Sequence, residues 1–183
     1  MTVAGNRPPL LRRVLKQDWE LLPDALLYAH TPPRMMEGFV RVERGDGPLS
    51  RLLGWLARLP EEGDRRPIIV RMSLEEDGEL WERWVQGRRY PSSLRIGAGF
   101  FHGLLVERFG VVAIGVALVW RDGRLEFQPR RWTLFGLPMP DSLVPSGASF
   151  ECEINGDFCF HIEITHEWTG LLIRYSGSLA PIQ

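Results

Sequence analysis

The pattern of apolar and polar residues changes near Pro67. Before it, Leu10–Asp18 and Ala25–His30 predict two short helices, and leucines at helical spacing predict an amphipathic helix over Leu49–Leu59. After it, apolar residues mostly alternate with polar ones, as in strands that bury one face. The N-terminal third is therefore expected to be partly helical and the rest of the chain to be rich in strands.

The alternating segments predict about ten strands separated by short turns. No strand–helix–strand alternation follows residue 67, so the expected fold class is mainly β (α+β). It consists of a strongly curved antiparallel sheet of about ten strands, a barrel or half-barrel, covered by two or three short helices from the N-terminal third. The predicted strands are Phe39–Glu43, Ile68–Leu74, Glu79–Gln86, Ser92–Ile96, Leu104–Phe109, Val111–Trp120, Arg124–Phe135, Ser149–Ile154, Phe158–His166 and Gly170–Gly177.

The length of 183 residues fits one domain. We expect residues 1–35 to form an N-terminal helical cap and residues 36–183 to form the curled sheet, which carries helix 49–59. The composition is 44% hydrophobic and 25% charged with a net charge of -1, which argues against disorder and against nucleic acid or membrane partners. An N-terminus without the apolar core of a signal peptide and the absence of a membrane-length apolar run predict a cytoplasmic protein.

One arginine falls on an otherwise apolar strand face. With Asp77-Gly78 as a two-residue turn, Arg83 pairs with Met72 and lies among apolar residues. An unpaired guanidinium there is costly, so Arg83 needs a carboxylate such as Glu107 or an anionic ligand. Both alternatives stay open at this point.

The two cysteines and the histidines give little sign of a metal site. For the hairpin around Asn155-Gly156, a three-residue loop ending at Asp157 would pair Cys152 with Phe160 and place Cys152 and Cys159 on opposite faces, so the thiols are expected to be free. In this register Glu151 and His161 would form a polar pair on the surface. The four histidines show no metal-ligand spacing, so no metal is expected.

Several short motifs resemble one protein family, domain-of-unknown-function family 4166. The family is identified here by Trp19–Pro23, Arg44–Leu49, Glu79–Arg83, Tyr90–Ser92, Glu107–Gly110, Leu134–Pro140 and Gly170–Gly177. The resemblance implies a bacterial domain that stands alone or follows an NAD(P)-binding domain of the saccharopine-reductase or short-chain-dehydrogenase type. It therefore implies a reductase as a partner. The chain itself has no glycine-rich phosphate loop, and no cofactor is expected.

Three functions remain as hypotheses. The favoured one is a non-catalytic domain that binds a small apolar, acyl-bearing or anionic molecule through Arg83, Trp81, Ser92 and Glu107. The second is an interaction module for an NAD(P)-dependent reductase. The third is an enzyme of the isomerase or hydrolase type that uses Glu107 and His30, which requires these two side chains to meet in one cleft.

Overall fold

A computed structural model describes residues 7–56 and 59–182. None of the helices in this part of the chain is long and apolar enough to cross a lipid bilayer. The helices are α1 (Leu10–Leu15), η1 (Lys16–Leu21), α2 (Asp24–Ala29), α3 (Pro48–Leu56), η2 (Gly99–Phe101) and η3 (Asp141–Leu143). The strands are β1 (Arg34–Arg44), β2 (Gly63–Leu74), β3 (Gly78–Val85), β4 (Arg88–Ile96), β5 (Leu105–Phe109), β6 (Val112–Arg121), β7 (Arg124–Leu134), β8 (Leu137–Pro138), β9 (Phe150–Ile154), β10 (Asp157–His166) and β11 (Gly170–Pro181).

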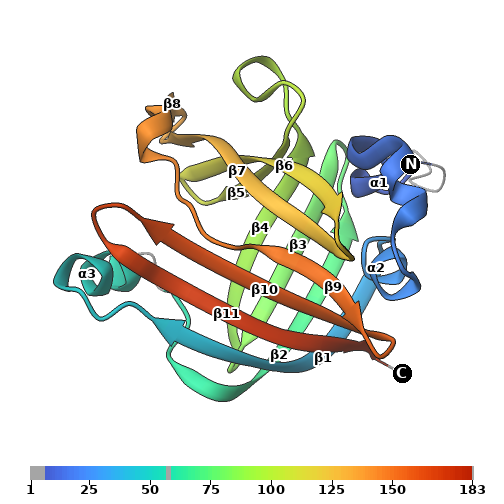
Figure 1. Cartoon of the computed structure of the whole chain (residues 1–183), viewed down its shortest axis with the longest axis horizontal. Coiled ribbons are helices and arrows are strands. Elements are labelled where there is room, and N and C mark those ends of the chain that lie inside the picture. The colour runs from blue at the N-terminus through green and yellow to red at the C-terminus, as the bar shows by residue number, and fades with distance from the viewer. Residues whose placement is uncertain (1–6, 57–58, 183) are drawn as a thin grey trace.

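The strands form one antiparallel sheet that closes into a ten-stranded barrel, with β8 as an additional strand (Figure 1). The order around the barrel is β6-β5-β4-β3-β2-β1-β11-β10-β9-β7, and pairing of β6 with β7 closes the ring. Closure leaves each of these ten strands with a neighbour on both sides, so backbone groups that would face solvent in an open sheet are paired. The predicted fold class is confirmed, and of its two predicted forms, barrel and half-barrel, the structure is the barrel.

The N-terminal helices cover one end of the barrel, at the right of Figure 1. Leu10 and Leu26 are buried there in the common core. Glu79 accepts a hydrogen bond from the backbone N–H of Leu10 at 2.9 Å, and Glu153 accepts one from the N–H of Ala25 at 3.0 Å. These N–H groups lie in the first turn of α1 and α2, where no intrahelical acceptor exists. Two barrel carboxylates thus anchor the helices to the sheet.

The predicted amphipathic helix is present as α3, at the opposite end of the barrel (Figure 1). Residues 57–58 of the predicted helix lie outside the described residues. Ser50 donates a hydrogen bond to the carbonyl oxygen of Leu171 at 2.6 Å and holds α3 against β11. The apolar face does not enter the core, because Leu49 and Leu52 are exposed and Trp55 is 74% exposed.

The register predicted for the hairpin of β2 and β3 is wrong by two residues. Met72 pairs with Trp81, and Val70 pairs with Arg83. The connection is longer than predicted and is closed by a hydrogen bond from the N–H of Glu75 to the carbonyl oxygen of Gly78 at 2.9 Å. A shift of two residues leaves every side chain on its face, so Arg83 still points into the barrel.

The register predicted for the hairpin of β9 and β10 is wrong by one residue, and this changes the faces. Asn155 and Gly156 have φ angles of 54° and 86° and form a two-residue turn, for which this residue pair is favoured. Cys152 therefore lies directly opposite Cys159 on the outer face, and not opposite Phe160. Both cysteines are free thiols, as expected.

The same correction moves Glu151 to the interior. Glu151 is opposite Phe160, and both side chains are buried. The predicted surface pair of Glu151 with His161 is therefore wrong. His161 is opposite Phe150 instead, and their rings stack with centroids 5.2 Å apart.

The inner wall of the barrel differs between its two ends. Near the helical cap, inward-facing side chains from seven strands are buried: Met36, Trp81, Leu94, Leu105, Leu125, Phe158 and Leu179. Towards the other end, inward-facing side chains of β3 to β6, β10 and β11 remain partly exposed: Arg83, Tyr90, Glu107, Ile114, Ile162, Ile164 and Tyr175. On β1 and β2 the wall stays buried, at Val40, Val42 and Ile68. Solvent thus reaches part of the inner wall beyond the cap.

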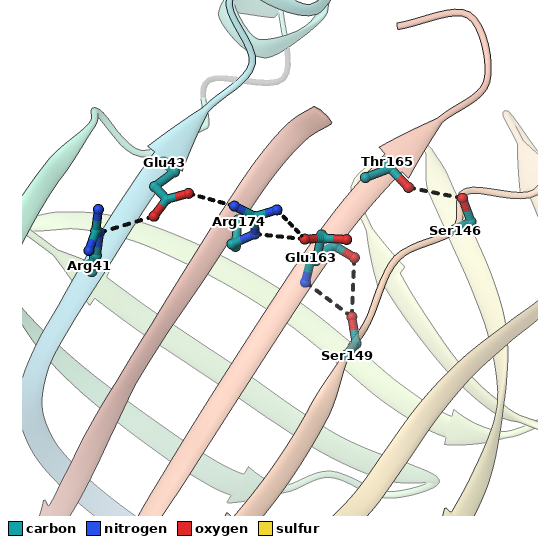
Figure 2. Close-up of polar contacts among 7 residues, drawn as sticks. All are labelled: Arg41, Glu43, Ser146, Ser149, Glu163, Thr165 and Arg174. Atoms are coloured by element: carbon teal, nitrogen blue, oxygen red, sulfur yellow. Dashed lines mark hydrogen bonds and ion pairs between the residues drawn. The ribbon is translucent and has the colours of Figure 1, made fainter. Parts of the chain in front are cut away.

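The outer face carries a chain of ion pairs across β1, β11 and β10 (Figure 2). Arg174 donates to Glu43 at 2.7 Å and to Glu163 at 2.6 Å, and Arg41 lies 3.0 Å from Glu43. The backbone of Glu163 also exchanges two hydrogen bonds with Ser149, which precedes β9. These contacts cross-link neighbouring strands on the side away from the core.

Candidate functional site

Arg83, Ser92 and Glu107 form a hydrogen-bonded triangle on the inner wall of the barrel. Nη1 of Arg83 donates to Oγ of Ser92 at 2.8 Å, and Nη2 donates to Oε1 of Glu107 at 3.0 Å. Oγ of Ser92 donates to the same oxygen of Glu107 at 2.6 Å. The residues come from the adjacent strands β3, β4 and β5, whose registers stagger them diagonally. Of the two kinds of partner considered for Arg83, the structure contains the carboxylate of Glu107, as an ion pair.

The triangle retains unused hydrogen-bonding capacity. A guanidinium has five N–H donors, of which Arg83 uses two. Among the residues that the structure describes, Nε of Arg83 and Oε2 of Glu107 have no hydrogen-bond partner. The side chains of Arg83 and Glu107 are 17% and 22% exposed, so a small molecule that reached the inner wall would meet free donors beside a free acceptor.

Arg83 carries a permanent positive charge. Burial alone would lower the pKa of Arg83, but the charge of Glu107, with contributions from Tyr175 and Glu151 and the hydrogen bond to Glu107, raises it above its ordinary value. The guanidinium therefore stays protonated at neutral pH and well above it. Its charge is balanced locally by the carboxylate of Glu107.

The ring of Trp81 is in contact with both Arg83 and His30. Cζ of Arg83 is 5.3 Å from the centroid of the Trp81 ring, within the range of a cation–π contact. The ring of His30 stacks on Trp81 with centroids 5.4 Å apart. Nε1 of Trp81 donates a hydrogen bond to Oε2 of Glu79 at 2.9 Å, and this bond holds the indole ring in its orientation.

His30 belongs to a second cluster, next to the helical cap. It is 0% exposed, and its Nε2 is hydrogen-bonded to Oε2 of Glu151 at 2.5 Å. Its Nδ1 has no partner within the described part of the chain. Glu107 is instead bonded to Arg83 and Ser92. The structure therefore does not bring together Glu107 and His30, the two candidates for catalysis.

Tyr175 on β11 is a further interior residue, and the sequence analysis did not single it out. Its ring packs edge-on against Phe160, with centroids 6.1 Å apart. Burial is the main cause that raises the pKa of Tyr175 to about 12; Arg83 lowers it, and Glu107 and Glu151 raise it. The phenol therefore stays protonated at neutral pH and is a hydrogen-bond donor. Tyr175 follows the apolar Ile173 by two residues on β11 and so lies on the same face, which is the sequence signal that could have indicated its inward position.

The site gathers groups that can form hydrogen bonds and apolar contacts. It offers the free donors of Arg83, the phenol of Tyr175 and the free acceptor of Glu107, beside the aromatic face of Trp81 and an apolar wall. Within residues 7–56 and 59–182, no cluster of three or more His, Cys, Asp or Glu side chains is arranged to hold a metal ion. Of the predicted ligand-binding residues, Arg83, Ser92, Glu107 and Trp81 lie together.

Comparison with known proteins identifies the family. None of the curated proteins compared with this chain matches it. The model of one family matches residues 27–179, which is most of the chain. The matched region contains the triangle together with Trp81, His30, Glu151 and Tyr175. The chain belongs to the family described as Domain of unknown function (DUF4166).

Proposed function

We propose that the protein is a non-catalytic binding domain whose barrel holds a small molecule with an apolar body and an acyl or similar oxygen-bearing end. The polar end accepts hydrogen bonds from Arg83. The observation that carries the proposal is the guanidinium of Arg83, which lies inside the barrel with donors unused by the described residues. Unpaired donors in a partly desolvated site cost free energy, and a ligand oxygen recovers it.

The apolar body of the ligand would lie along the partly exposed inner wall. Ile114, Ile162 and Ile164 face inward and keep accessible surface. Covering such surface contributes about 25 cal/mol per Å² of apolar area removed from water. An apolar ligand body would therefore gain more free energy from contact with this wall than a polar one would.

The polar end is more consistent with a carbonyl, carboxyl or hydroxyl group than with a phosphate. Glu107 already neutralises Arg83, so a doubly charged phosphate would meet a carboxylate as well as the guanidinium. A carbonyl oxygen takes the free N–H groups of Arg83 without this repulsion. A hydroxyl or carboxyl proton can in addition be donated to Oε2 of Glu107.

A second candidate function is docking to an NAD(P)-dependent reductase in the cytoplasm. The observation that favours it is the exposed apolar face of α3, with Leu49, Leu52 and Trp55 in solvent. Trp168, in the turn between β10 and β11, is also exposed. This function and ligand binding inside the barrel are compatible, because they use different surfaces. The enzymatic alternative has less support, since Glu107 and His30 belong to separate clusters.

Native mass spectrometry of the protein purified from its own host tests the binding proposal. We expect a specific additional mass under native conditions that disappears on denaturation. The variant Arg83→Leu should lose this mass, and Arg174→Leu, which removes an exposed outer-face arginine, should keep it. If Arg83→Leu does not fold, the double variant Arg83→Leu/Glu107→Leu, which leaves no unpaired carboxylate, replaces it. An additional mass that persists in the folded Arg83 variant would contradict the assigned role of Arg83.

A further inference from the structure

The hairpin of β9 and β10 places two thiols side by side. Cys152 and Cys159 are direct cross-strand partners in an antiparallel ladder. Such partners have Cα atoms about 4.5 to 5.5 Å apart and side chains on the same face. A disulfide spans Cα atoms about 4.4 to 6.8 Å apart, so this position is compatible with one. In the structure both cysteines are reduced.

The surroundings distinguish the two thiols. Cys152 is buried beside Arg124 on β7, whereas Cys159 is partly exposed and lies opposite Ser178 on β11. An oxidant in solution therefore reaches Cys159 first. Burial, the largest cause, raises the pKa of both thiols, so the reduced pair is protonated at neutral pH and is stable without an oxidant.

We propose that Cys152 and Cys159 are a modification site, at which hydrogen peroxide converts the dithiol to an intramolecular disulfide. Cys159 first loses its thiol proton, the resulting thiolate attacks one peroxide oxygen, the O–O bond breaks and hydroxide leaves, which gives a sulfenic acid. The thiolate of Cys152 then attacks the sulfenic sulfur of Cys159 and displaces a second hydroxide. The two thiol protons neutralise the two hydroxide ions, so the dithiol is oxidised by two electrons and one peroxide is reduced to two waters.

The position of the pair connects its redox state to the helical cap. On β9, Cys152 lies between Glu151, which holds His30, and Glu153, which holds the backbone N–H of Ala25. A disulfide at Cys152 fixes β9 to β10 at the point where β9 carries both cap anchors. The oxidised form should therefore hold the anchoring residues more rigidly than the reduced form.

The test is peptide mapping after treatment of the folded protein with excess hydrogen peroxide. Free thiols are blocked by alkylation in acid, and the protein is digested with a protease that cleaves after glutamate. Cleavage at Glu151 and Glu153 separates Cys152 from Cys159. We expect the fragment with Cys159 to carry the Cys152–Glu153 dipeptide, and a reductant applied before alkylation to release it.

Single-cysteine variants sharpen the result. In Cys152→Ala, Cys159 should accumulate as a sulfenic acid that dimedone traps, because the resolving thiol is absent. Cys159→Ala should give much less dimedone adduct, because Cys152 is buried. Recovery of both cysteines as alkylated thiols, or as separate sulfinic acids without a linked fragment, from protein that retains its circular dichroism spectrum would overturn the proposal.

Discussion

Arg83 and Arg174 are both paired with carboxylates, Arg83 inside the barrel and Arg174 on its outer face. On the outer face, Nε, Nη1 and Nη2 of Arg174 all contact Glu43 or Glu163 (Figure 2). On the inner wall, Arg83 contacts Ser92 and Glu107 and leaves Nε without a partner among the described residues. Every guanidinium nitrogen of Arg174, the more exposed of the two, thus contacts a carboxylate, whereas Nε of the less exposed Arg83 has no such contact within the described residues.

This difference separates a structural ion pair from a candidate binding site. The hydrogen bonds from Arg174 to Glu163 and Glu43 raise its pKa and link three strands, and no further partner is needed. Pairs on the outer face, such as these partly exposed ones, are screened by water and salt and are expected to contribute little to stability. At Arg83 the incomplete pairing leaves donors in a partly desolvated site, which is why ligand binding is proposed for Arg83 and not for Arg174.

The largest expected effect is the difference in stability between the variants Arg83→Leu and Arg174→Leu. Arg83→Leu leaves Glu107 unpaired on the inner wall and should lower the free energy of unfolding by about 2 to 3 kcal/mol. Arg174→Leu should leave the urea midpoint near that of the wild type. Urea denaturation followed by tryptophan fluorescence measures both.

The double variant Arg83→Leu/Glu107→Leu completes this comparison. It removes both charges and should recover much of the lost stability, because an apolar pair replaces an uncompensated carboxylate. Equal midpoints for Arg83→Leu and Arg174→Leu would show that the two ion pairs do not differ in the way described here.

A second prediction concerns alkaline pH and Tyr175. Its pKa is about 12 in the folded protein and about 10 in an unfolded chain. The stability linked to this raised pKa is fully present below pH 10 and is lost as the pH rises through 12, by roughly 2 to 3 kcal/mol in total. Tyr175→Phe should flatten the stability profile in this window, and Tyr28→Phe, at an exposed tyrosine, should not. Denaturation midpoints measured from pH 8 to 12 test this, and an unchanged profile in Tyr175→Phe would contradict it.

The smallest effect is expected for two serines. Ser92→Ala removes the hydroxyl that links Arg83 to Glu107 and should cost about 1 kcal/mol. Ser149→Ala, in the outer network of Figure 2, removes two longer hydrogen bonds and should cost less. Urea midpoints again provide the readout, and a larger loss for Ser149→Ala would reverse the proposed order of the inner and outer networks.

The sequence predicted correctly which side chains face the inner wall where this depends only on the alternation of faces along a strand. Alternation placed Arg83 on the apolar face, and the parity survived a register error of two residues. Glu107 was named from the sequence as one possible partner, beside an anionic ligand, and the structure pairs it with Arg83. At β9 and β10 an error of one residue reversed the faces, so Glu151 was taken for a surface residue and its contact with the buried His30 was missed.

Closure of the barrel could not be read from the sequence. A curled sheet of about ten strands was expected, but contacts between distant segments decide whether it closes. β1 pairs with β11, which lies at the other end of the chain, and β7 pairs with β9 across a long connection. Tyr175 reaches the interior near Arg83 and Glu107 only through this long-range pairing. Its role could therefore not be assigned from local pattern.

The most direct test of the central claim is a fluorescence titration with cis-parinaric acid, a fatty acid that becomes emissive in apolar surroundings. We predict saturable binding to the wild type, unchanged affinity in Arg174→Leu, and a loss of roughly tenfold to a hundredfold in Arg83→Leu, as expected for a charge-assisted hydrogen bond. Equal affinities of the wild type and a folded Arg83→Leu variant, or no binding to the wild type, would contradict the account.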